Sequence, residues 1–293
     1  MNHTPVLTKE VLELLDPKPN ENFIDGTIGG AGHAKLILEK TSPFGKLLGI
    51  DADKGQITNA RYATQKFNER VLLVQGSYAD MTEITARVRL KPIHGILLDL
   101  GYSSWHMEVS GKGFSFLKNE TLDMRYGNTE LTAKDIISTY KEAELEKILE
   151  EFGEETFARQ IAKKIVQQRK AKPITSTFEL KELVESVIPG RLQHGRIHCA
   201  TKTFQALRIA VNQELDQVQK ALPEALQLLA HGGRLAVISF HSLEDRIVKT
   251  AFKEWEKTGA VTILTKKPVV AQAQELMVNP RARSAKLRVI IKN

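Results

Sequence analysis

The sequence predicts an α/β protein whose mostly parallel sheet is interrupted by a helical insertion. Three observations support this prediction. Strand-like apolar runs alternate with helical segments over the first hundred residues, a purely helical stretch follows, and the alternation resumes towards the C-terminus. Strands that alternate with helices need crossover connections, which produce parallel sheets. A chain of 293 residues is long enough for a well-buried core and two structural units.

The first part of the sheet is expected from four short strands. A helix at residues 6–15, with apolar residues at helical spacing, precedes them. The strands are expected at 22–25, 47–51, 71–74 and 95–100, with a helix at 34–39 after the first of them. The run Ile96-Leu97-Leu98 is continuously apolar, which is typical of a strand covered on both faces.

The middle of the chain is expected to be helical. Helices are predicted at 132–152, 155–170 and 178–187, and Ser176 with Glu179 matches a capping box that would start the third. Pro189-Gly190 would end it. This stretch predicts a helical insertion at about 107–200, between a first part of the α/β domain at 1–106 and a second part at 201–293.

The second part of the α/β domain is expected to begin with a helical region at 203–230. Gly232-Gly233 would then turn into an apolar strand at 234–240. Ser242 resembles the cap of a helix that runs towards Lys257, and strands at 261–264 and 287–291 would complete the sheet.

Composition places the chain among soluble globular proteins. Hydrophobic residues make up 42% and charged residues 26%, and no apolar run reaches the roughly 18 residues of a membrane span. The first residues lack the basic region and cleavage site of a signal peptide. Cys199 is the single cysteine, which rules out an internal disulfide and fits a reducing compartment. A cytoplasmic location is therefore expected.

The charge distribution favours a polyanionic partner. Lysine and arginine number 42 against 35 aspartate and glutamate residues, giving a net charge of +7. Residues 156–178 and 186–213 contain basic residues but no carboxylate, and the last stretch is again basic from Arg281 to Lys292. Such acid-free stretches are typical of nucleic-acid-binding surfaces. The alternative is a set of solvated helix faces.

The segment DGTIGGAGH at 25–33 predicts a cofactor site. It lies between an expected strand and an expected helix, and Gly29, Gly30 and Gly32 let the backbone turn tightly and approach a ligand. Asp51 ends the next strand, where a carboxylate can accept hydrogen bonds from a ribose diol. These features fit NAD and S-adenosylmethionine equally, although the spacing is not G-x-G-x-x-G. An ordinary tight turn beside a surface aspartate is the alternative.

Two more polar residues follow strands at the same predicted edge. Asp99 ends the fourth strand, where it could hold a cofactor or orient a reacting amine. His241 follows the strand at 234–240 and could be a proton carrier or a structural histidine. Tyr102 and Trp105 could stack a base or belong to the core.

The quoted segments together resemble one family over nearly the whole chain. HTPVLTKEVLELL, DGTIGGAGHA, GIDAD, LLDLGYSS, KGFSF, LDMRYG, FGEE, FQALRIAVNQEL, ISFHSLEDR and NPRARSAKLR are similar to segments of the bacterial ribosomal RNA small subunit methyltransferase H family, also called MraW. The resemblance implies a class I S-adenosylmethionine-dependent methyltransferase sheet with a helical RNA-recognition insertion. It implies methylation of the exocyclic N4 of one cytidine in 16S rRNA, either free or in the 30S subunit.

The resemblance also implies site residues. The cofactor contacts of the family map onto seven residues: Ala31, Gly32, His33, Asp51, Tyr78, Asp99 and His106. Asp99 is the candidate catalytic residue, with backbone carbonyls or hydroxyls of 100–104 beside it. Candidate substrate contacts are Arg125, Lys202, Arg208 and His241; for Arg125 and Arg208 the alternative is an intramolecular ion pair. No metal site is expected, since His194 and His198 lack a nearby acidic ligand and lie in a predicted loop.

Several positions depart from the family pattern. Ala31, Tyr78 and His106 stand where glycine, phenylalanine and glutamine are usual. The methyl group of Ala31 is tolerable unless the residue needs a positive φ, and His106 loses the paired hydrogen bonds of an amide. Lys112 and Lys202 replace arginines and lose bidentate phosphate recognition, and Cys199 replaces proline.

Two other functions compete with a methyltransferase. A nicotinamide-dependent oxidoreductase would share the glycine turn and Asp51 but would not explain the DLGYSS segment or the basic stretches. A non-catalytic assembly factor that binds RNA would keep the fold without turnover.

Overall fold

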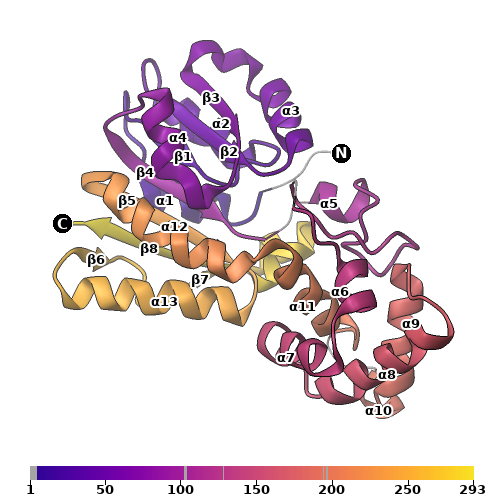
Figure 1. The fold of residues 1–293 in the computed structure, drawn as a ribbon. Coiled ribbons are helices and arrows are strands. Elements are labelled where there is room, and N and C mark those ends of the chain that lie inside the picture. The colour runs from indigo at the N-terminus through magenta and orange to yellow at the C-terminus, as the bar shows by residue number, and fades with distance from the viewer. Residues whose placement is uncertain (1–4, 102–103, 128, 194, 196) are drawn as a thin grey trace. The chain divides into compact units, whose positions relative to one another are not determined.

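The computed structural model describes residues 5–101, 104–127, 129–193, 195 and 197–293. The chain forms two compact units, one of Met1–Gly101 with Leu215–Asn293 and one of Tyr102–Glu214 (Figure 1). The range 107–200, expected as the insertion, lies inside the second unit, which extends further at both ends. The extension at the C-terminal end is helix α11 (Thr201–Asn212), which packs on α7 (Glu142–Gly153).

The first unit contains the sheet. Its strands are β1 (Phe23–Asp25), β2 (Leu47–Asp51), β3 (Val71–Gln75), β4 (Ile93–Asp99), β5 (Leu229–Ser239), β6 (Val261–Ile263), β7 (Val269–Val270) and β8 (Lys286–Lys292). Their order is β3-β2-β1-β4-β5-β8-β6, and β7 also pairs with β8. Strands β1 to β5 are parallel and β8 is antiparallel to β5. This arrangement confirms the predicted class I methyltransferase sheet.

The strand order reverses at one point of the sheet. The chain runs from β1 outwards through β2 to β3, and then returns to the other side of β1 with β4. Ligands of open α/β sheets bind outside the carboxyl ends of the strands at such a switch point. Here those ends carry Asp25 on β1 and Asp99 on β4, which are neighbouring strands.

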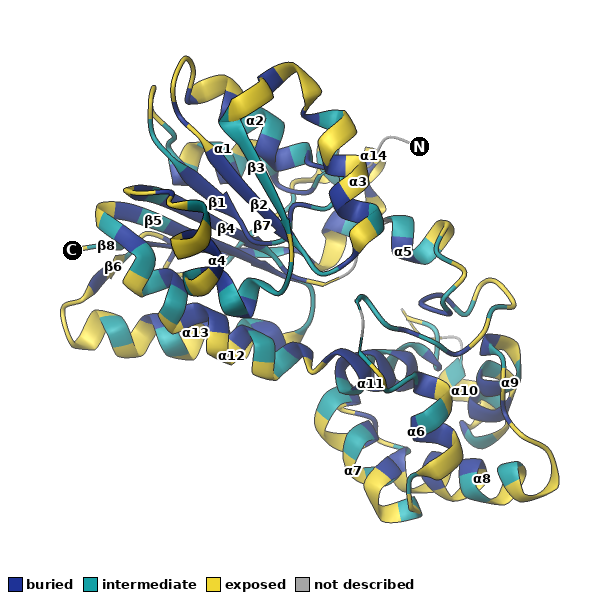
Figure 2. Ribbon diagram, turned by 45° about the horizontal axis from the view of Figure 1, so that its top comes forward, coloured by how far each residue is buried: buried dark blue, intermediate teal, exposed yellow. Residues whose placement is uncertain are grey.

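Helices cover both faces of the sheet. Successive strand residues point to opposite faces, so that Ile24 and Leu98 contribute to one core and Phe23 and Leu97 to the other. Helices α4 (Met81–Val88), α12 (Glu214–Leu228) and α13 (Ser242–Lys257) supply the first core. Helices α1 (Thr8–Leu15), α2 (Gly32–Lys40) and α3 (Lys54–Ala63) supply the second. Figure 2 shows the central strands buried between them.

The second unit is helical and has its own core. Its longer helices are α6 (Ala133–Thr139), α7, α8 (Ala158–Ala171), α9 (Thr177–Val187) and α11, with the short α5 (Ser104–Glu108) and α10 (Gly190–Gln193). Their apolar faces meet in one cluster that includes Leu145, Ile161, Leu180 and Phe204. The predicted capping box at Ser176 and Glu179 is present at the start of α9.

Three expected elements differ from the structure. The helix expected at 132–152 is two helices, because Tyr140 and Lys141 adopt extended backbone between α6 and α7. The helix expected at 203–230 is also two, because Gln213 takes a left-handed conformation, with φ of 50°, between α11 and α12. The strand expected from residue 234 already begins at Leu229. It therefore includes Gly232, which lies where the pairing of β5 with β4 shifts its register.

The remaining elements of the first unit are short. They are α14 (Ala273–Val278) and the 3₁₀ helices η1 (Gln65–Arg70), η2 (Tyr78–Asp80) and η3 (Pro280–Ser284). Within the described part of the chain, no helix has the length and apolar character needed to cross a membrane.

Candidate active site

The glycine turn is held between the strand ends by backbone hydrogen bonds. Gly26 N–H donates to the Leu97 carbonyl over 2.9 Å, and Ile28 N–H donates to the Ile50 carbonyl over 2.9 Å. A Cβ on Gly26 would lie 2.6 Å from Leu98 Cδ2 and 3.1 Å from Tyr78 Cβ, so this glycine is required by packing. Tyr78 therefore lies against the turn, and its contact with a cofactor stays a prediction.

The rest of the turn leads into α2 through two left-handed residues. Gly29 has a φ of 46° and Ala31 a φ of 59°. Ala31 is the residue before the first turn of α2, and at this φ its methyl group is strained where glycine would not be. Gly32 is fixed by packing, because a Cβ there would lie 2.7 Å from Pro5 Cγ. The substitution of glycine by Ala31 therefore carries a cost in this conformation.

Asp51 at the end of β2 connects the turn to the next loop. One carboxylate oxygen accepts from Gly29 N–H over 3.0 Å, and the other accepts from Asp53 N–H over 2.9 Å. A carboxylate can accept about four hydrogen bonds, and these two fix the orientation of the Asp51 side chain. Asp51 is thus hydrogen-bonded directly to the glycine turn, and its contact with a ribose stays a prediction.

Asp99 ends β4 beside the turn. Its backbone N–H donates to Thr27 Oγ1 over 2.7 Å, and its Oδ2 lies 3.8 Å from Nε2 of the buried His33. Its Oδ1 is buried and has no hydrogen-bond partner among the described residues. A buried carboxylate oxygen without a donor is costly, because desolvation is not compensated. A ligand that brings an N–H or O–H group to this oxygen would remove that cost.

Carboxyl groups are concentrated around Asp99. Burial raises the pKa of Asp25 to about 7, and the negative charge of Asp51 also raises it. The hydrogen bond from Thr27 N–H has the opposite effect and lowers this pKa. Burial raises the pKa of Asp99 well above its usual range, and the charges of Asp25 and Glu244 raise it further. Within the described residues, no lysine or arginine contributes to either shift. This edge of the sheet therefore favours a cationic ligand over an anionic one.

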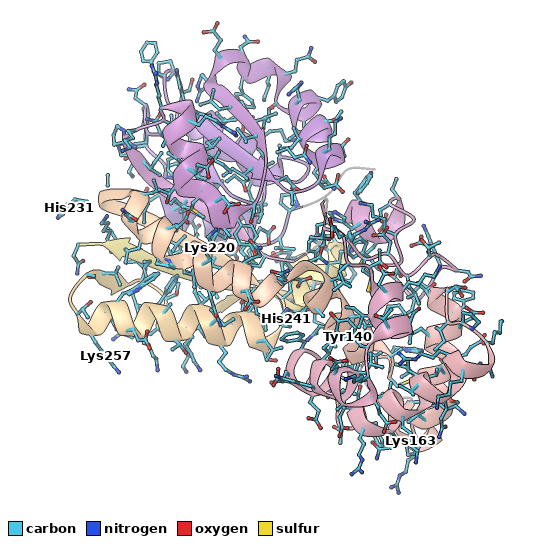
Figure 3. The ribbon with its side chains drawn as sticks, in the orientation of Figure 1. Tyr140, Lys163, Lys220, His231, His241 and Lys257 are labelled. Atoms are coloured by element: carbon cyan, nitrogen blue, oxygen red, sulfur yellow. The ribbon has the colours of Figure 1, made fainter. Side chains whose placement is uncertain are left out.

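His241 lies at the same edge but is used as a helix cap. Figure 3 labels it at the start of α13. Its Nδ1 accepts from Glu244 N–H over 3.4 Å, and the Glu244 carboxylate accepts from Phe240 N–H over 2.8 Å. Its Nε2 lies 3.2 Å from the same carboxylate. The cap is thus His241, one residue before the expected Ser242, and these contacts favour the structural alternative for this histidine.

The other candidate residues belong to the helical unit. His106 is buried and packs edge-on against Phe114 and Tyr126, with ring centroids 5.1 and 5.2 Å away. Lys112 Nζ donates to the Arg125 carbonyl over 3.1 Å. Lys202 Nζ donates to the Glu154 carbonyl over 2.7 Å. Tyr102 and His194 lie outside the described residues.

Both candidate arginines form ion pairs within the helical unit. Arg125 donates two hydrogen bonds to Asp123, over 2.9 and 2.8 Å. Arg208 is buried and donates to both oxygens of Glu214, over 2.8 and 2.9 Å. Glu214 also accepts from Tyr126 Oη. The alternative of intramolecular pairing accounts for these contacts, and direct contact with a substrate stays a prediction for both.

Three residues of this site were not singled out from the sequence. Asp25 and Thr27 were assigned only to the strand end and the turn, and Glu244 only to a helix start. Asp25 and Glu244 act on Asp99 through space, from β1 and α13, and sequence spacing does not report such distances. The run of Asp25, Asp51 and Asp99 at three strand ends was the available signal for a carboxylate cluster.

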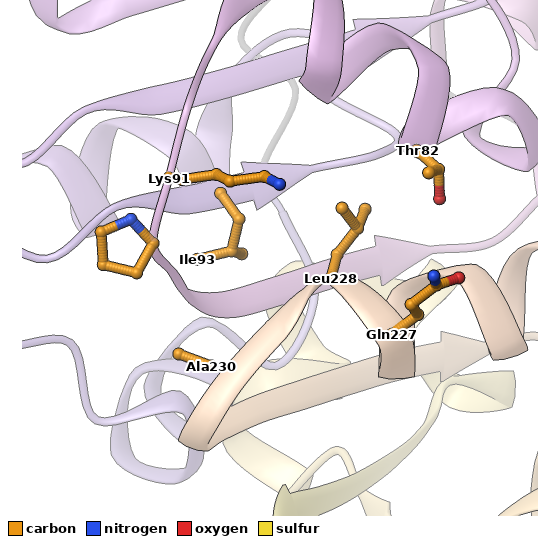
Figure 4. Close-up of a pocket in the computed structure, with 7 residues that line it drawn as sticks. Thr82, Lys91, Ile93, Gln227, Leu228 and Ala230 are labelled. Atoms are coloured by element: carbon orange, nitrogen blue, oxygen red, sulfur yellow. The ribbon is translucent and has the colours of Figure 1, made fainter.

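One cavity in the first unit lies away from this site. It has a volume of about 560 Å³ and is lined by Thr82 of α4, by the residues that begin β4 and by the junction of α12 with β5 (Figure 4). The residues Lys91, Pro92 and Ile93 stand at the amino end of β4, opposite to Asp99. This cavity therefore does not coincide with the carboxylate cluster.

Comparison with known proteins gives concordant results. The model of the MraW methylase family matches residues 1–293. The chain is 46% identical to ribosomal RNA small subunit methyltransferase H of Syntrophotalea carbinolica, with 98% of this chain and 97% of that protein aligned. The proteins of the same name from Trichlorobacter lovleyi and Geobacter sulfurreducens are 45% and 47% identical, with the same coverage.

Proposed function

The chain belongs to the MraW methylase family, and from this premise we propose that it transfers a methyl group from S-adenosylmethionine to the exocyclic N4 of a cytidine in 16S rRNA. The family match covers the whole chain, and relatives at about 46% identity carry the name of a small-subunit rRNA methyltransferase. The buried Oδ1 of Asp99, which has no hydrogen-bond partner among the described residues, lies within a carboxylate cluster and is the structural observation that supports the proposal most directly.

The residues at the sheet edge fit this cofactor. S-adenosylmethionine supplies an electrophilic methyl group on a positively charged sulfur, and it also carries a ribose diol and an amine. Asp51 would accept hydrogen bonds from the diol, and the glycine turn with Ala31, Gly32 and His33 would lie along the cofactor, with Tyr78 beside it. The carboxylates around Asp99 offset its positive charge. The pyrophosphate of NAD would instead be repelled, and the nicotinamide alternative loses support.

Asp99 is the residue proposed to act on the substrate. The N4 lone pair of cytosine is delocalised into the ring, which makes the amine a poor nucleophile. An acceptor on one N4 hydrogen localises that lone pair, and Asp99 Oδ1 lacks a donor in the described structure. The pKa of Asp99 is raised in the cofactor-free protein, and a bound cation would favour the ionised form, which is the acceptor. The carbonyls of Leu100 and Gly101 are the described backbone acceptors beside it.

The substrate must present an unpaired base. A paired cytidine is held in its stack, so the target is single-stranded or swung out before the reaction. We assign the helical unit to holding the surrounding RNA, with Arg125, Lys202 and Arg208 as candidate contacts. Free rRNA and the 30S subunit are both possible forms of the substrate, and a cytoplasmic location follows from either.

Cofactor choice is tested by thermal unfolding with each ligand. S-adenosylmethionine at 100 times its Kd is expected to stabilise the protein by about 2.7 kcal/mol, which raises Tm by a few degrees, while NAD leaves Tm unchanged. Stabilisation by NAD alone would overturn the assignment. Stabilisation by S-adenosylmethionine without label transfer to small subunits from cells lacking the enzyme would favour the assembly-factor alternative.

A further inference from the structure

One exposed helix face in the second unit combines positive charge with a lack of carboxylates. Helix α8 buries Ala158, Ile161, Ala162 and Ile165 in the core of its unit. Its remaining surface carries four exposed basic residues: Arg159, Lys163, Lys164 and Lys170. Three glutamines are interspersed with them, and the sequence of the helix contains no acidic residue. Figure 3 shows Lys163 extending outwards from α8.

Three of these residues form a stripe. At about 100° per residue, Arg159, Lys163 and Lys170 fall within about 40° of one another around the helix axis. The stripe, defined here by these three residues, is about 16 Å long at 1.5 Å per residue. No ion pair joins any of the three to another described residue. The neighbouring Arg169 and Lys172 differ, since they contact the Ile137 carbonyl and Glu179.

The helices on either side of α8 have the opposite character. Helices α7 and α9 both pack against α8. The sequence of α7 contains five glutamates and one lysine, and that of α9 contains three glutamates and one lysine. Carboxylates are thus abundant on the adjacent helices and absent from α8. This segregation distinguishes the stripe from an ordinary solvated face, on which both signs of charge alternate.

From this separation we infer that the stripe on α8 binds the phosphate backbone of the RNA substrate. The inference rests on the proposed function, which supplies a polyanionic substrate. Unpaired, exposed lysines and arginines on a rigid helix can each neutralise one phosphate and release its counterion. Carboxylates within the same stripe would cancel this attraction, and there are none. The glutamines add uncharged hydrogen-bond donors along the same face.

The test compares two triple variants with equal loss of charge. The first is Arg159→Gln, Lys163→Gln and Lys170→Gln on α8. The control is Lys249→Gln, Lys253→Gln and Lys257→Gln on α13, where three exposed lysines also share one stripe. Asp245, Glu254 and Glu256 stand in the same helix as the control lysines. Each protein is titrated with unmodified small-subunit rRNA between 50 and 200 mM salt, and methyl transfer is followed with saturating RNA.

The α8 variant is expected to show a weaker salt dependence of RNA binding than the wild type. Three lost phosphate contacts lower the slope of log affinity against log salt by about two, which is about 16-fold over this salt range. Its rate at saturating RNA and its Tm are expected to stay unchanged, and the α13 control is expected to match the wild type. Lys163→Arg with Lys170→Arg is expected to preserve binding.

Three results would overturn the inference. The α8 variant could keep the wild-type salt slope, or the α13 control could lose as much affinity as the α8 variant. The α8 variant could also lose affinity for intact small subunits but not for naked rRNA, which would assign the stripe to a ribosomal protein. Absence of methyl transfer by the wild-type protein would count against the proposed function instead.

Discussion

Asp99 is the residue on which cofactor binding and catalysis are proposed to converge. Asp99→Asn preserves the shape of the side chain but removes its ability to ionise, and is expected to lower methyl transfer about 100-fold or more. Tm is expected to hold or rise, because the folded protein no longer has to bury a group that is ionised in the unfolded chain. Single-turnover transfer to unmethylated subunits and thermal unfolding provide the two measurements.

The matched control for this variant is Asp80→Asn. Asp80 pairs with Lys220 on the surface, where an ion pair contributes little to stability. This control is expected to retain full activity. Wild-type turnover by Asp99→Asn would remove Asp99 from the mechanism.

Asp25 gives the cofactor-free protein a specific pH dependence. Its pKa in the folded protein, about 7, exceeds the ordinary value of 3.8, so the folded state retains a proton that the unfolded chain has lost. The contribution of Asp25 to the free energy of unfolding is therefore greatest below pH 3.8, and it is lost as the pH rises to about 7. The loss is on the order of 4 kcal/mol. Asp25→Asn is expected to remove this decline, as measured by urea unfolding across pH 4–8.

An unchanged pH profile in Asp25→Asn would show that the proton resides elsewhere in the cluster. Binding of the cationic cofactor is expected to release a proton near pH 6.5 from the wild type and less from the variant. Calorimetry in two buffers of different ionisation enthalpy measures that release.

Ala31 offers a test of backbone strain in the glycine turn. Its φ of 59° costs about 1 kcal/mol for a residue with a Cβ and little for glycine. Ala31→Gly is expected to stabilise the protein by up to about 1 kcal/mol, less the entropy that glycine adds to the unfolded chain. Gly29→Ala places a Cβ at a φ of 46° and is expected to destabilise by a similar amount. Equal stability of the two variants in urea unfolding would contradict this account.

At the scale of elements, hydrogen bonds attach the end of α11 to the segment LDMRYG at residues 122–127. Asn212 Nδ2 donates to the Met124 carbonyl over 2.7 Å, and Tyr126 N–H donates to Asn212 Oδ1 over 2.9 Å. Glu214 accepts from Tyr126 and from Arg208. The matching segments FQALRIAVNQEL and LDMRYG are therefore held together as one structural unit.

The ion pair between Arg208 and Glu214 predicts that substitution of Arg208 strongly lowers the free energy of unfolding. Arg208→Met leaves the buried carboxylate of Glu214 without its cation and is expected to destabilise the protein by about 3–5 kcal/mol. Arg208→Met combined with Glu214→Gln is expected to recover much of this loss. Urea unfolding measures both. A destabilisation under 1 kcal/mol, together with lost RNA affinity, would instead support direct contact of Arg208 with the substrate.

The elements also show which features the sequence encodes locally. Capping at Ser176 and the strand ends at Asp51 and Asp99 follow from short patterns, and the structure has them. The breaks at Tyr140 and Gln213 were not foreseen, because neither position carries glycine or proline, the usual signals of a helix end. Arg208 and Glu214 lie on different helices, and no helical periodicity predicts such a pair.

For the whole molecule, the alternation of strands and helices was enough to predict the sheet and its interruption. The order of the strands and the antiparallel pairing of β8 with β5 were not predicted, because both depend on contacts between segments far apart in the sequence. The acidic character of the cofactor edge was not predicted. It depends on three strand ends and the first turn of α13 meeting in space, whereas the net charge of the chain is +7.

The protein has a cluster of carboxyl groups at the proposed cofactor edge, whereas the chain as a whole is basic. Such a protein would bind a cationic methyl donor and a polyanionic RNA with different surfaces. Wild-type protein, isotope-labelled S-adenosylmethionine and small subunits from cells lacking the enzyme test this directly, with the RNA digested to nucleosides and analysed by mass spectrometry. The account predicts label in N4-methylcytidine, at one position, and its loss in Asp99→Asn. Label in another nucleoside, or none with the cofactor bound, would contradict it.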